Sequence, residues 1–301
     1  MSYMKELTEL CGRLGCRITP ECPLSGYDTF KIGGPCRGLV SINSTEAASA
    51  LIRFLRSGGI KYGIIGRGSN ILVPDEGFDG IVLLFGGDFA DISVDGNRII
   101  CQSGALLASA CVHAQQNSLT GMENLFGIPG TVGGALYMNA GAYGSEMADI
   151  VVSAEYLDTE GQLHTIDKAD MELSYRHSIF SGTNNVITSV TMELSAGDSS
   201  AIKDAMNECM KKRSAKQPLD YPSAGSTFKR PEGSYASLLI EQCGLKGMTC
   251  GGAMVSEKHS GFVINKGFAT FADVSELCDN IIKIVKEKTG YTLELEPVIL
   301  K

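Results

Sequence analysis

Two glycine-rich segments have the composition of loops through which a backbone approaches a bound anion. The first reads GRGSN over residues 66–70, and the second reads GIPGTVGG over residues 127–134. Glycine accepts positive φ and carries no side chain, and unpaired N–H groups in such turns form concave anion sites. The second segment could also open a helix whose N-terminus faces a phosphate. Both segments therefore indicate phosphate chemistry.

Neither segment is a standard dinucleotide or P-loop fingerprint. In the first, Ile71 occupies the sixth position of G-x-G-x-x-G, and the chain contains no G-x-x-x-x-G-K-[ST]. Taken alone, residues 66–70 are better explained as an ordinary turn. A second such loop, followed by MNAGAYG at residues 138–144, favours a phosphate-binding role over an ordinary turn. Together the loops favour a nucleotide pyrophosphate as the ligand.

A third chemical feature is a local excess of basic residues in an acidic chain. Residues 200–232 contain seven Lys and Arg against four Asp and Glu, whereas the whole chain has a net charge of −8. Two of them, Lys229 and Arg230, follow a Gly-Ser-Thr turn and are suited to a pyrophosphate or a carboxylate. Lys211 and Lys212 fit a solvated helix face better.

The first 90 residues have the pattern of a small α+β unit. Asn43, with Glu46 three residues later, predicts the start of a helix that ends at Gly58. Apolar runs predict strands at 62–66, 71–73 and 80–85. The first glycine-rich loop thus connects two strands.

A second unit of short strands and one helix follows, and a third begins near residue 200. A hairpin is predicted over 92–101, and Ser103 is expected to cap a helix that runs to about Asn117. The polar residues 195–199 are predicted as the linker to the third unit. Further strands are predicted at 150–157, 162–166 and 186–194, and further helices before Pro218 and over 273–289, the last ending at Gly290.

Several blocks of the sequence resemble the UDP-N-acetylenolpyruvoylglucosamine reductase (MurB) family. They occur in order from about residue 25 to the C-terminus, which makes the combination highly specific. The blocks are TFKIGG at 29–34, GRGSNILV at 66–73, GIPGTVGGA with MNAGAYG within 127–144, YRHSIF at 175–180, GSTFKRP at 225–231 and KHSGFVIN at 258–265.

The resemblance implies an α+β protein with a two-subdomain FAD-binding region of the vanillyl-alcohol-oxidase (PCMH) type and a C-terminal α+β substrate-binding domain. The expected bounds are 1–90 and 91–196 for the two FAD-binding subdomains and 197–301 for the C-terminal domain. The length and the lack of an inserted tyrosine-containing loop resemble the shorter subclass of the family. FAD is expected to be bound non-covalently, with NADPH as co-substrate.

The resemblance also implies the reaction, which is reduction of the enolpyruvyl ether of UDP-N-acetylglucosamine enolpyruvate to UDP-N-acetylmuramate in peptidoglycan precursor synthesis. This chemistry needs a hydride source, an acid and a group that stabilises negative charge. Ser226 matches the family's proton donor, although its local sequence alone indicates a turn residue. Arg176 matches the catalytic arginine. Glu296 matches the C-terminal glutamate by ungapped counting from Gly290, and a gap in that count would move the assignment to Glu294.

The matching blocks also imply which residues bind FAD and which bind the sugar nucleotide. The residues expected to bind FAD are Gly66, Arg67, Gly68, Ser69, Asn70, Gly127, Ile128, Pro129, Gly130, Thr131, Gly133, Gly134, Asn139, Ala140 and Gly141. The residues expected to bind substrate are Tyr175, Lys229, Arg230, His259 and Asn265. Many members of the family carry Asn where this chain has Arg230, so the contact of that residue is left open.

Composition excludes several other classes of protein. An acidic chain with 44% hydrophobic and 20% charged residues is typical of a globular protein that binds neither nucleic acid nor an anionic membrane. Neither a signal peptide nor a run of ~20 apolar residues is found, so a cytoplasmic location is expected, and a monomer is expected too. The ten cysteines are dilute and favour reduced core thiols. No C-x-x-C pair occurs, so no metal site is expected.

Two alternative functions fit the sequence less well. A Ser-His-Asp hydrolase could use Ser226 with His259, but no G-x-S-x-G nucleophile elbow surrounds Ser226. A protein that binds flavin or a sugar nucleotide without catalysis would keep the glycine loops and lack one of Ser226, Arg176 or Glu296. All three of these residues are present.

Overall fold

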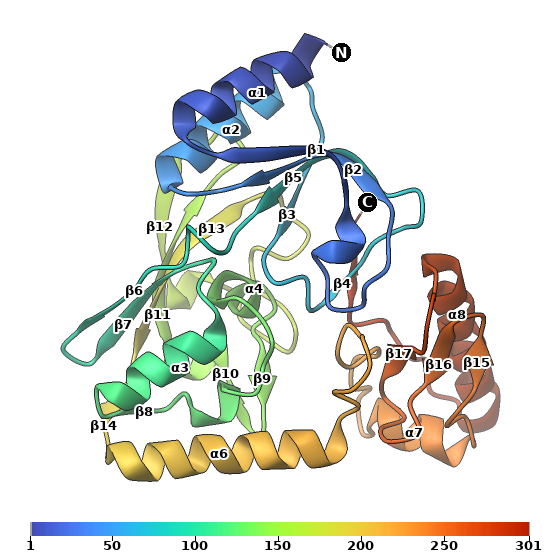
Figure 1. Ribbon diagram of the computed structural model, residues 1–301. Coiled ribbons are helices and arrows are strands. Elements are labelled where there is room, and N and C mark those ends of the chain that lie inside the picture. The colour runs from blue at the N-terminus through green and yellow to red at the C-terminus, as the bar shows by residue number, and fades with distance from the viewer. Residues whose placement is uncertain (1, 301) are drawn as a thin grey trace. The chain divides into compact units, whose positions relative to one another are not determined.

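The computed structural model describes residues 2–300, which divide into two compact units. The first unit consists of the described residues up to Glu21, together with Arg37–Arg67 and Asp79–Lys211. The second consists of Cys22–Cys36, Gly68–Phe78 and the described residues from Lys212 onward. Two short segments of the N-terminal half therefore fold with the C-terminal residues, a grouping that no sequence boundary anticipated. Figure 1 labels the elements.

One core of the first unit lies between two helices and a four-stranded sheet. The strand order is β1-β2-β5-β3, and β3 runs parallel to β5. Leu7, Leu51 and Ile81 are fully buried where the helices meet the sheet. The elements are α1 (Ser2–Leu14), β1 (Arg17–Pro23), β2 (Pro35–Ser41), α2 (Thr45–Ser57), β3 (Tyr62–Ile65) and β5 (Phe78–Leu84).

The predicted cap of α2 is wrong by one residue. The amide of Ala47 donates to the Oγ of Ser44 at 3.1 Å, so Ser44 caps the helix. Asn43 instead donates from its Nδ2 to the carbonyl of Leu14 at 3.1 Å. Its side chain thereby holds the end of α1, a contact between segments far apart in the sequence.

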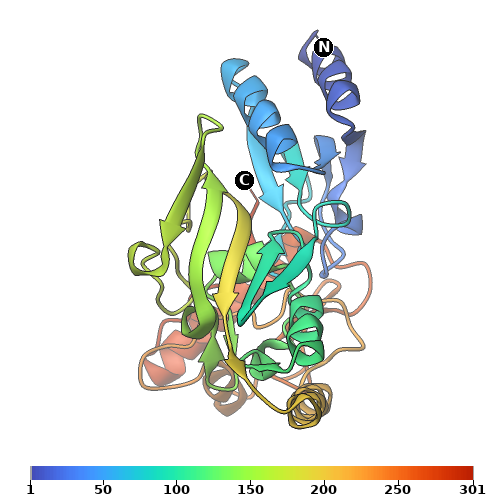
Figure 2. The ribbon, with the colours of Figure 1, turned by 90° about the vertical axis from the view of Figure 1, so that its left-hand side faces the viewer.

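The second core of the first unit lies under a five-stranded antiparallel sheet with the order β12-β11-β13-β7-β6. Figure 2 shows these strands in teal, green and yellow, side by side, with α3 beside them. The predicted hairpin at 92–101 is confirmed, with Asp95 paired to Arg98. The elements are β6 (Ile92–Asp95), β7 (Arg98–Gln102), α3 (Leu107–Gln116), α4 (Val132–Tyr137), α5 (Met147–Ile150), β11 (Val151–Leu157), β12 (Leu163–Asp167) and β13 (Val186–Glu193).

The predicted start of α3 at Ser103 is also wrong, because the helix begins at Leu107. Ser103 is buried, its amide donates to the carbonyl of Thr188 at 2.8 Å, and its carbonyl accepts from the amide of Gly133 at 2.8 Å. Ser103 therefore joins β13 to the start of α4.

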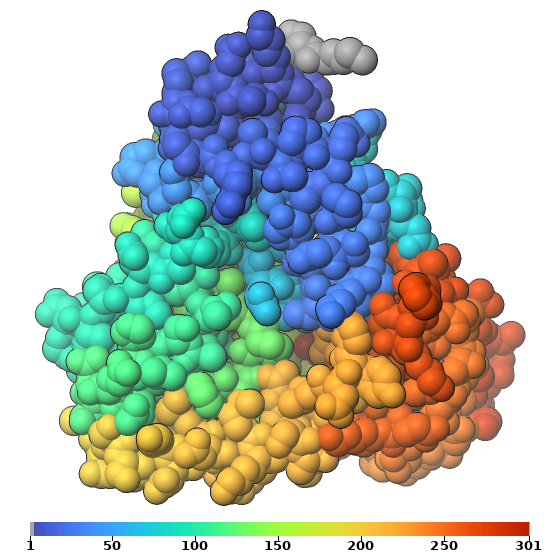
Figure 3. All heavy atoms as spheres, in the orientation of Figure 1, coloured from blue at the N-terminus to red at the C-terminus, as the bar shows by residue number. Residues whose placement is uncertain are grey.

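Residues 195–199, predicted as a linker, are partly a strand. Ser195 and Ala196 form β14, which pairs with β8 (Leu119–Thr120). The helix α6 (Ser199–Lys216) follows and ends just before Pro218, as predicted. Most of its side chains are exposed, and its atoms form the yellow lower edge of Figure 3. The short elements elsewhere are η1 (Leu24–Gly26), η2 (Glu123–Leu125), η3 (Lys168–Asp170), β9 (Gly141–Ala142) and β10 (Ser145–Glu146).

The second unit packs two helices on a small antiparallel sheet of order β15-β16-β17. Its last helix begins at Phe271, two residues earlier than predicted, and ends at Gly290 (φ 81°) as predicted. The Asp75 carboxylate accepts the amides of Phe271 and Ala272 at 2.7 and 3.0 Å and so caps this helix. The elements are β4 (Ile71–Leu72), α7 (Ala236–Gln242), β15 (Thr249–Cys250), β16 (Ala253–Val255), β17 (Val263–Asn265), α8 (Phe271–Thr289) and β18 (Val298–Ile299).

Antiparallel sheets packed with helices in both units confirm the α+β class. All ten cysteines are free thiols and nine are buried, which confirms the interpretation as reduced core residues. Burial raises the pKa of Cys101 to about 12 and that of Cys11 to about 11, so both thiols stay protonated. Within residues 2–300, none of the helices combines the length and the apolar character that a membrane span requires.

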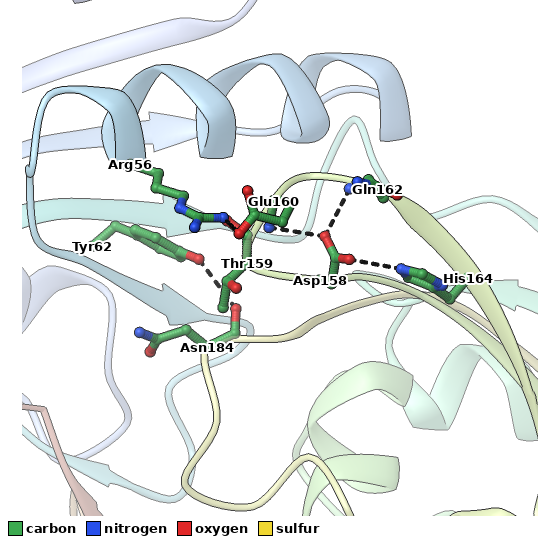
Figure 4. Close-up of polar contacts among 8 residues, drawn as sticks. All are labelled: Arg56, Tyr62, Asp158, Thr159, Glu160, Gln162, His164 and Asn184. Carbon is green, nitrogen blue, oxygen red and sulfur yellow. Dashed lines mark hydrogen bonds and ion pairs between the residues drawn. The ribbon is translucent and has the colours of Figure 1, made fainter.

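A polar cluster connects α2 with the turn between β11 and β12 (Figure 4). Asp158 is its centre: one carboxylate oxygen accepts the amides of Glu160 and Gln162 at 2.9 Å, and the other lies 2.7 Å from Nε2 of His164. Arg56 of α2 forms an ion pair with Glu160 in the same turn. These hydrogen bonds hold the pKa of Asp158 below its usual value.

Replacing Asp158 by Asn is expected to lower Tm at pH 7, because the lowered pKa means that the ionised carboxylate stabilises the fold. This contribution exists above the unfolded-state pKa of about 3.9 and is lost as pH falls through the lower folded-state value. Thermal unfolding from pH 3 to 8 measures it, and the Tm gap to the wild-type protein should close below pH ~4. Asp167→Asn, at an exposed aspartate, is the control. A gap that does not change with pH would contradict this account.

Candidate active site

The two glycine-rich loops of the first unit pack directly against each other. Gly66 follows β3, and a Cβ at this position would clash with the Oγ1 of Thr131. A Cβ at Gly133 would lie 2.6 Å from the Cβ of Ser103. Glycine is therefore required at both positions by close packing, in addition to any ligand.

The second loop opens a helix as predicted, but the first amides of that helix are already used. Thr131 caps α4 by accepting from the amide of Gly134 at 3.3 Å. The amides of Val132 and Gly133 donate at 2.8 Å to the carbonyls of Ala105 and Ser103. A phosphate at this loop would therefore be bound by other groups.

At Gly134, the second glycine-rich loop exposes its backbone without a covering side chain. Gly134 is exposed, and a Cβ there would meet only the Oγ1 of Thr131, at 3.4 Å. Arg67, in the first loop, is also exposed and carries a fixed positive charge. Open backbone and a fixed positive charge are each suited to an anionic group such as a pyrophosphate.

Arg176 lies in a strained turn of the first unit. Ser174 and His177 exchange two backbone hydrogen bonds of 3.1 Å around it, and Arg176 has a φ of 56°. A non-glycine residue with positive φ costs about 1–3 kcal/mol and persists only when its surroundings hold it. The guanidinium lies over the ring of Tyr175, 4.9 Å from its centroid.

Two residues predicted to bind FAD hold this turn. Asn139 is fully buried, donates from Nδ2 to the carbonyl of Ser174 at 3.0 Å and accepts the amide of Ala148 at 2.8 Å. The carbonyl of Gly141 accepts a hydrogen bond of 3.4 Å from Arg176. The second loop and the arginine therefore belong to one connected structure.

In the second unit, the rest of the first glycine loop packs on the segment before residue 30. Gly68 has a φ of 67°, and a Cβ there would lie 2.7 Å from the Cα of Asp28. The carbonyl of Gly68 accepts the amide of Thr29 at 3.1 Å. Asn70 donates from its side chain to the carbonyl of Glu296 at 3.4 Å.

Ser226 lies between a glycine with positive φ and a threonine held by two hydrogen bonds. Gly225 has a φ of 79°. Thr227 donates its amide to the carbonyl of Gly261 at 2.8 Å, and its Oγ1 accepts the amide of Val263 at 2.8 Å. These hydrogen bonds make Thr227 an anchor of the loop that carries Ser226, and the sequence patterns did not single it out. Only its place directly after the serine could have pointed to it.

Backbone pairing brings the C-terminal segment to the same loop. The amide of Glu296 donates to the carbonyl of Thr227 at 3.0 Å, and the amide of Lys229 donates to the carbonyl of Glu294 at 2.8 Å. The backbone of Glu296 is thus held by Thr227, the residue that directly follows Ser226. The side chain of Glu294 is 73% exposed and forms an ion pair of 3.6 Å with Lys229.

The remaining predicted substrate residues have different surroundings. Arg230 is exposed, with its guanidinium 6.0 Å from the ring centroid of Tyr235. Asn265 is buried and uses its carboxamide on Phe30, Gly267 and Ala269 at 3.0–3.2 Å. Asn265 therefore connects loops of the fold, and its contact with substrate stays a prediction.

His259 is half-buried beside Phe262, with ring centroids 5.0 Å apart. Its Nδ1 accepts the amide of Gly261 at 3.2 Å, and burial lowers its pKa below the usual value. The ring is therefore neutral at physiological pH, with the proton on Nε2.

Comparison with known proteins first defines the class. A family model described as "FAD binding domain" matches residues 36–167. Wild-type Phl p 4.0202, a glucose dehydrogenase, superposes with a TM-score of 0.50 over 65% of this chain and 44% of its own, at 15% identity, and so shares the fold. The matched residues contain an FAD-binding domain, and the glycine-rich loops at 66–70 and 127–134 both lie within it.

Further matches define the family. The model described as "UDP-N-acetylenolpyruvoylglucosamine reductase, C-terminal domain" matches residues 217–300. The reductase of Clostridium perfringens (strain 13 / Type A) is 44% identical over 94% of this chain and 93% of its own. That of Caldanaerobacter subterraneus subsp. tengcongensis is 46% identical over 92% and 91%. The crystal structure of the Thermus caldophilus reductase (MurB) covers 95% of this chain and 99% of its own at 32% identity, with a TM-score of 0.80.

The chain therefore belongs to the UDP-N-acetylenolpyruvoylglucosamine reductase family, and it is an FAD-dependent oxidoreductase.

The strained backbone at Arg176 gives a test of the turn. Arg176→Asn should change the free energy of unfolding by less than about 1 kcal/mol, because Asn adopts positive φ readily. Arg176→Val should cost about 1–3 kcal/mol more, because a β-branched residue resists this conformation. Urea denaturation of both variants measures the difference. Equal stability of the two would show that the turn relaxes and that the positive φ is not enforced.

Proposed function

We propose that this chain catalyses the NADPH-dependent reduction of the enolpyruvyl ether of UDP-N-acetylglucosamine enolpyruvate to UDP-N-acetylmuramate, with FAD bound non-covalently. The observation that carries the proposal is the pairing of residues 227–229 with 294–296, which anchors Glu296 beside the loop of Ser226. The names of the similar reductases support the same substrate. We further propose that it acts as a cytoplasmic monomer in peptidoglycan precursor synthesis.

The chemistry that FAD supplies when bound is hydride transfer, which no side chain can provide. The residues that would hold it are those of the glycine loops at 66–70 and 127–134 and of the segment 139–141. Close packing of Gly66 against Thr131 keeps both loops at one place on the first unit. In this proposal the remaining catalytic tasks fall to side chains.

Arg176 stabilises the negative charge that develops on the carboxylate of the enolpyruvyl group. A planar, permanently charged guanidinium suits this role because it forms paired hydrogen bonds with a carboxylate. The turn that holds it, through Asn139 and Gly141, reduces the motion that would otherwise weaken this contact. Glu296 acts with Arg176 in polarising the same group.

Ser226 donates the proton to the carbon next to the site of reduction. Its hydroxyl is a weak acid, but the acceptor carbon is strongly basic, so proton transfer succeeds if the geometry is fixed. The two hydrogen bonds of Thr227 and the pairing to Glu296 supply that fixation. Lys229 and Arg230, which follow on the same strand-like segment, are proposed partners of the pyrophosphate, with Tyr175, His259 and Asn265 completing the substrate contacts.

The hydrolase alternative conflicts with the surroundings of His259. A serine triad requires the Nδ1–H of the histidine to donate to a carboxylate. Here Nδ1 of His259 accepts a hydrogen bond from Gly261 instead. The ring therefore has the wrong tautomer to act as the base for Ser226.

Replacing Ser226 by Ala tests the assignment of the acid. The purified wild-type protein should be yellow, and NADPH oxidation should depend on the enolpyruvyl sugar nucleotide. The variant should lose at least about 100-fold in that activity, the usual contribution of a general acid, while NADPH still reduces the flavin at the wild-type rate. Stopped-flow spectroscopy separates the two half-reactions. Equal loss of both would mean that Ser226 is structural, and a colourless protein would refute the function.

A matched pair of glutamates tests which carboxylate is catalytic. Glu296→Gln should lower kcat by at least about tenfold, because it removes a charge that acts at the reacting group. Glu294→Gln should change kcat less than about twofold, since an exposed ion pair contributes little. Steady-state kinetics of both variants decide the question. A larger loss at Glu294 would move the assignment by two residues.

A further inference from the structure

Asp28 is a buried carboxylate that belongs neither to the residues expected to bind FAD nor to those assigned a role in the proposed reaction. It is 8% exposed, and one of its oxygens accepts the amide of Lys31. Its other oxygen has no hydrogen-bond partner within the described part of the chain. Leaving a buried polar atom unsatisfied costs free energy. Functional sites are where such breaks of a local stability rule are expected.

The next residue, Thr29, joins two loops of the active site. Its amide donates to the carbonyl of Gly68 at 3.1 Å, in the first glycine loop. Its Oγ1 donates to the carbonyl of Ser223 at 2.7 Å, and the amide of Ser223 donates back to the carbonyl of Thr29 at 3.1 Å. We call Asp28 and Thr29 the clasp. All of these contacts lie within the second unit.

The clasp holds one end of the loop that carries Ser226. Ser223 marks this end, and Thr227, with its bonds to Gly261 and Val263, marks the other. Between them, Gly225 has a positive φ, and a Cβ at this residue would meet nothing within 4 Å. Within the loop, Ala224 is buried and the amide of Gly225 donates to the Oγ of Ser223 at 3.5 Å. The position of the Ser226 hydroxyl therefore depends on how firmly Ser223 and Thr227 are held.

We propose that Asp28 is a positioning residue for Ser226: its carboxylate holds the turn at 28–32, and this turn presents Thr29 to Ser223. The proposal rests on the proposed function, in which Ser226 is the acid. A charged acceptor binds backbone amides more strongly than a neutral one does. The ionised form of Asp28 thus gives the tighter turn.

Burial raises the pKa of Asp28 to about 6, and the nearby backbone amides of Lys31, Ile32 and Phe30 act in the opposite direction. The ionisable residues on the same turn are Tyr27 and the exposed Lys31, and Gly68 meets Asp28 with backbone alone. Because the folded-state pKa is raised, the native state binds more protons between pH ~4 and 6, and stability falls as pH rises through this window. The carboxylate therefore tightens the turn at a cost in overall stability.

The experiment compares Asp28→Asn and Thr29→Val with Thr29→Ser, which keeps the hydroxyl, and with Asp279→Asn, which changes an exposed aspartate of α8. Two readouts do not involve the loaded enzyme: amide hydrogen exchange of the peptide 223–227 and Tm from pH 4 to 8. Two others are kcat and KM for the enolpyruvyl sugar nucleotide, and the rate of flavin reduction by NADPH.

Asp28→Asn and Thr29→Val should each speed exchange at Ser223 and lower kcat about tenfold, with KM and flavin reduction changed less than about twofold. The double variant should be no slower than either single variant, and Thr29→Ser and Asp279→Asn should behave as wild type. Asp28→Asn should also gain Tm relative to wild type as pH rises from 4 to 7. A more stable yet slower enzyme is the signature of positioning.

Unchanged exchange at Ser223 with unchanged kcat in both variants would overturn the proposal, as would a Tm loss in Asp28→Asn that is equal at every pH. If Asp28→Asn fails to fold, Thr29→Val decides through the same readouts. If the wild-type protein shows no enolpyruvyl-dependent oxidation, the proposed function fails, whereas exchange and Tm still decide whether Asp28 holds the loop.

Discussion

Backbone pairing between residues 227–229 and 294–296 is the constraint on which the candidate site residues of the second unit depend. It is made of main-chain hydrogen bonds, so it does not depend on which side chains these residues carry. From Glu296 the chain continues into β18, which pairs in parallel with β4, directly after Asn70. Two successive backbone pairings therefore connect the loop of Ser226, the C-terminal glutamate and the end of the first glycine-rich loop.

The loops of the first unit are held in place by a different kind of contact. Its loops are held by close packing where side chains are absent, as at Gly66 and Gly133, and by buried amide groups such as that of Asn139. Arg176 keeps a positive φ because this framework over-determines it. Rigid loops lower the cost of ordering a charged side chain at the moment of reaction.

Local signals predicted most elements, and they failed where a distant contact decided the outcome. Gly290 ends α8 as its sequence indicates, because a glycine at a helix C-terminus adopts positive φ at little cost. Asn43 and Ser103 both look like helix caps, yet each is used elsewhere, by Leu14 and by Thr188 and Gly133. Capping preference is worth about 1 kcal/mol, so one tertiary hydrogen bond is enough to override it.

The sequence by itself determined the family and the α+β class, since these follow from residue types in a fixed order, and it named the candidate site residues as predictions. It did not determine which segments fold together. Residues 22–36 and 68–78 join the C-terminal unit only through contacts with residues some 200 positions away, such as that between Thr29 and Ser223. The surroundings of Glu294 and Glu296 also come from tertiary structure, because both have the same local pattern and differ only in their partners, Lys229 for the one and Thr227 for the other.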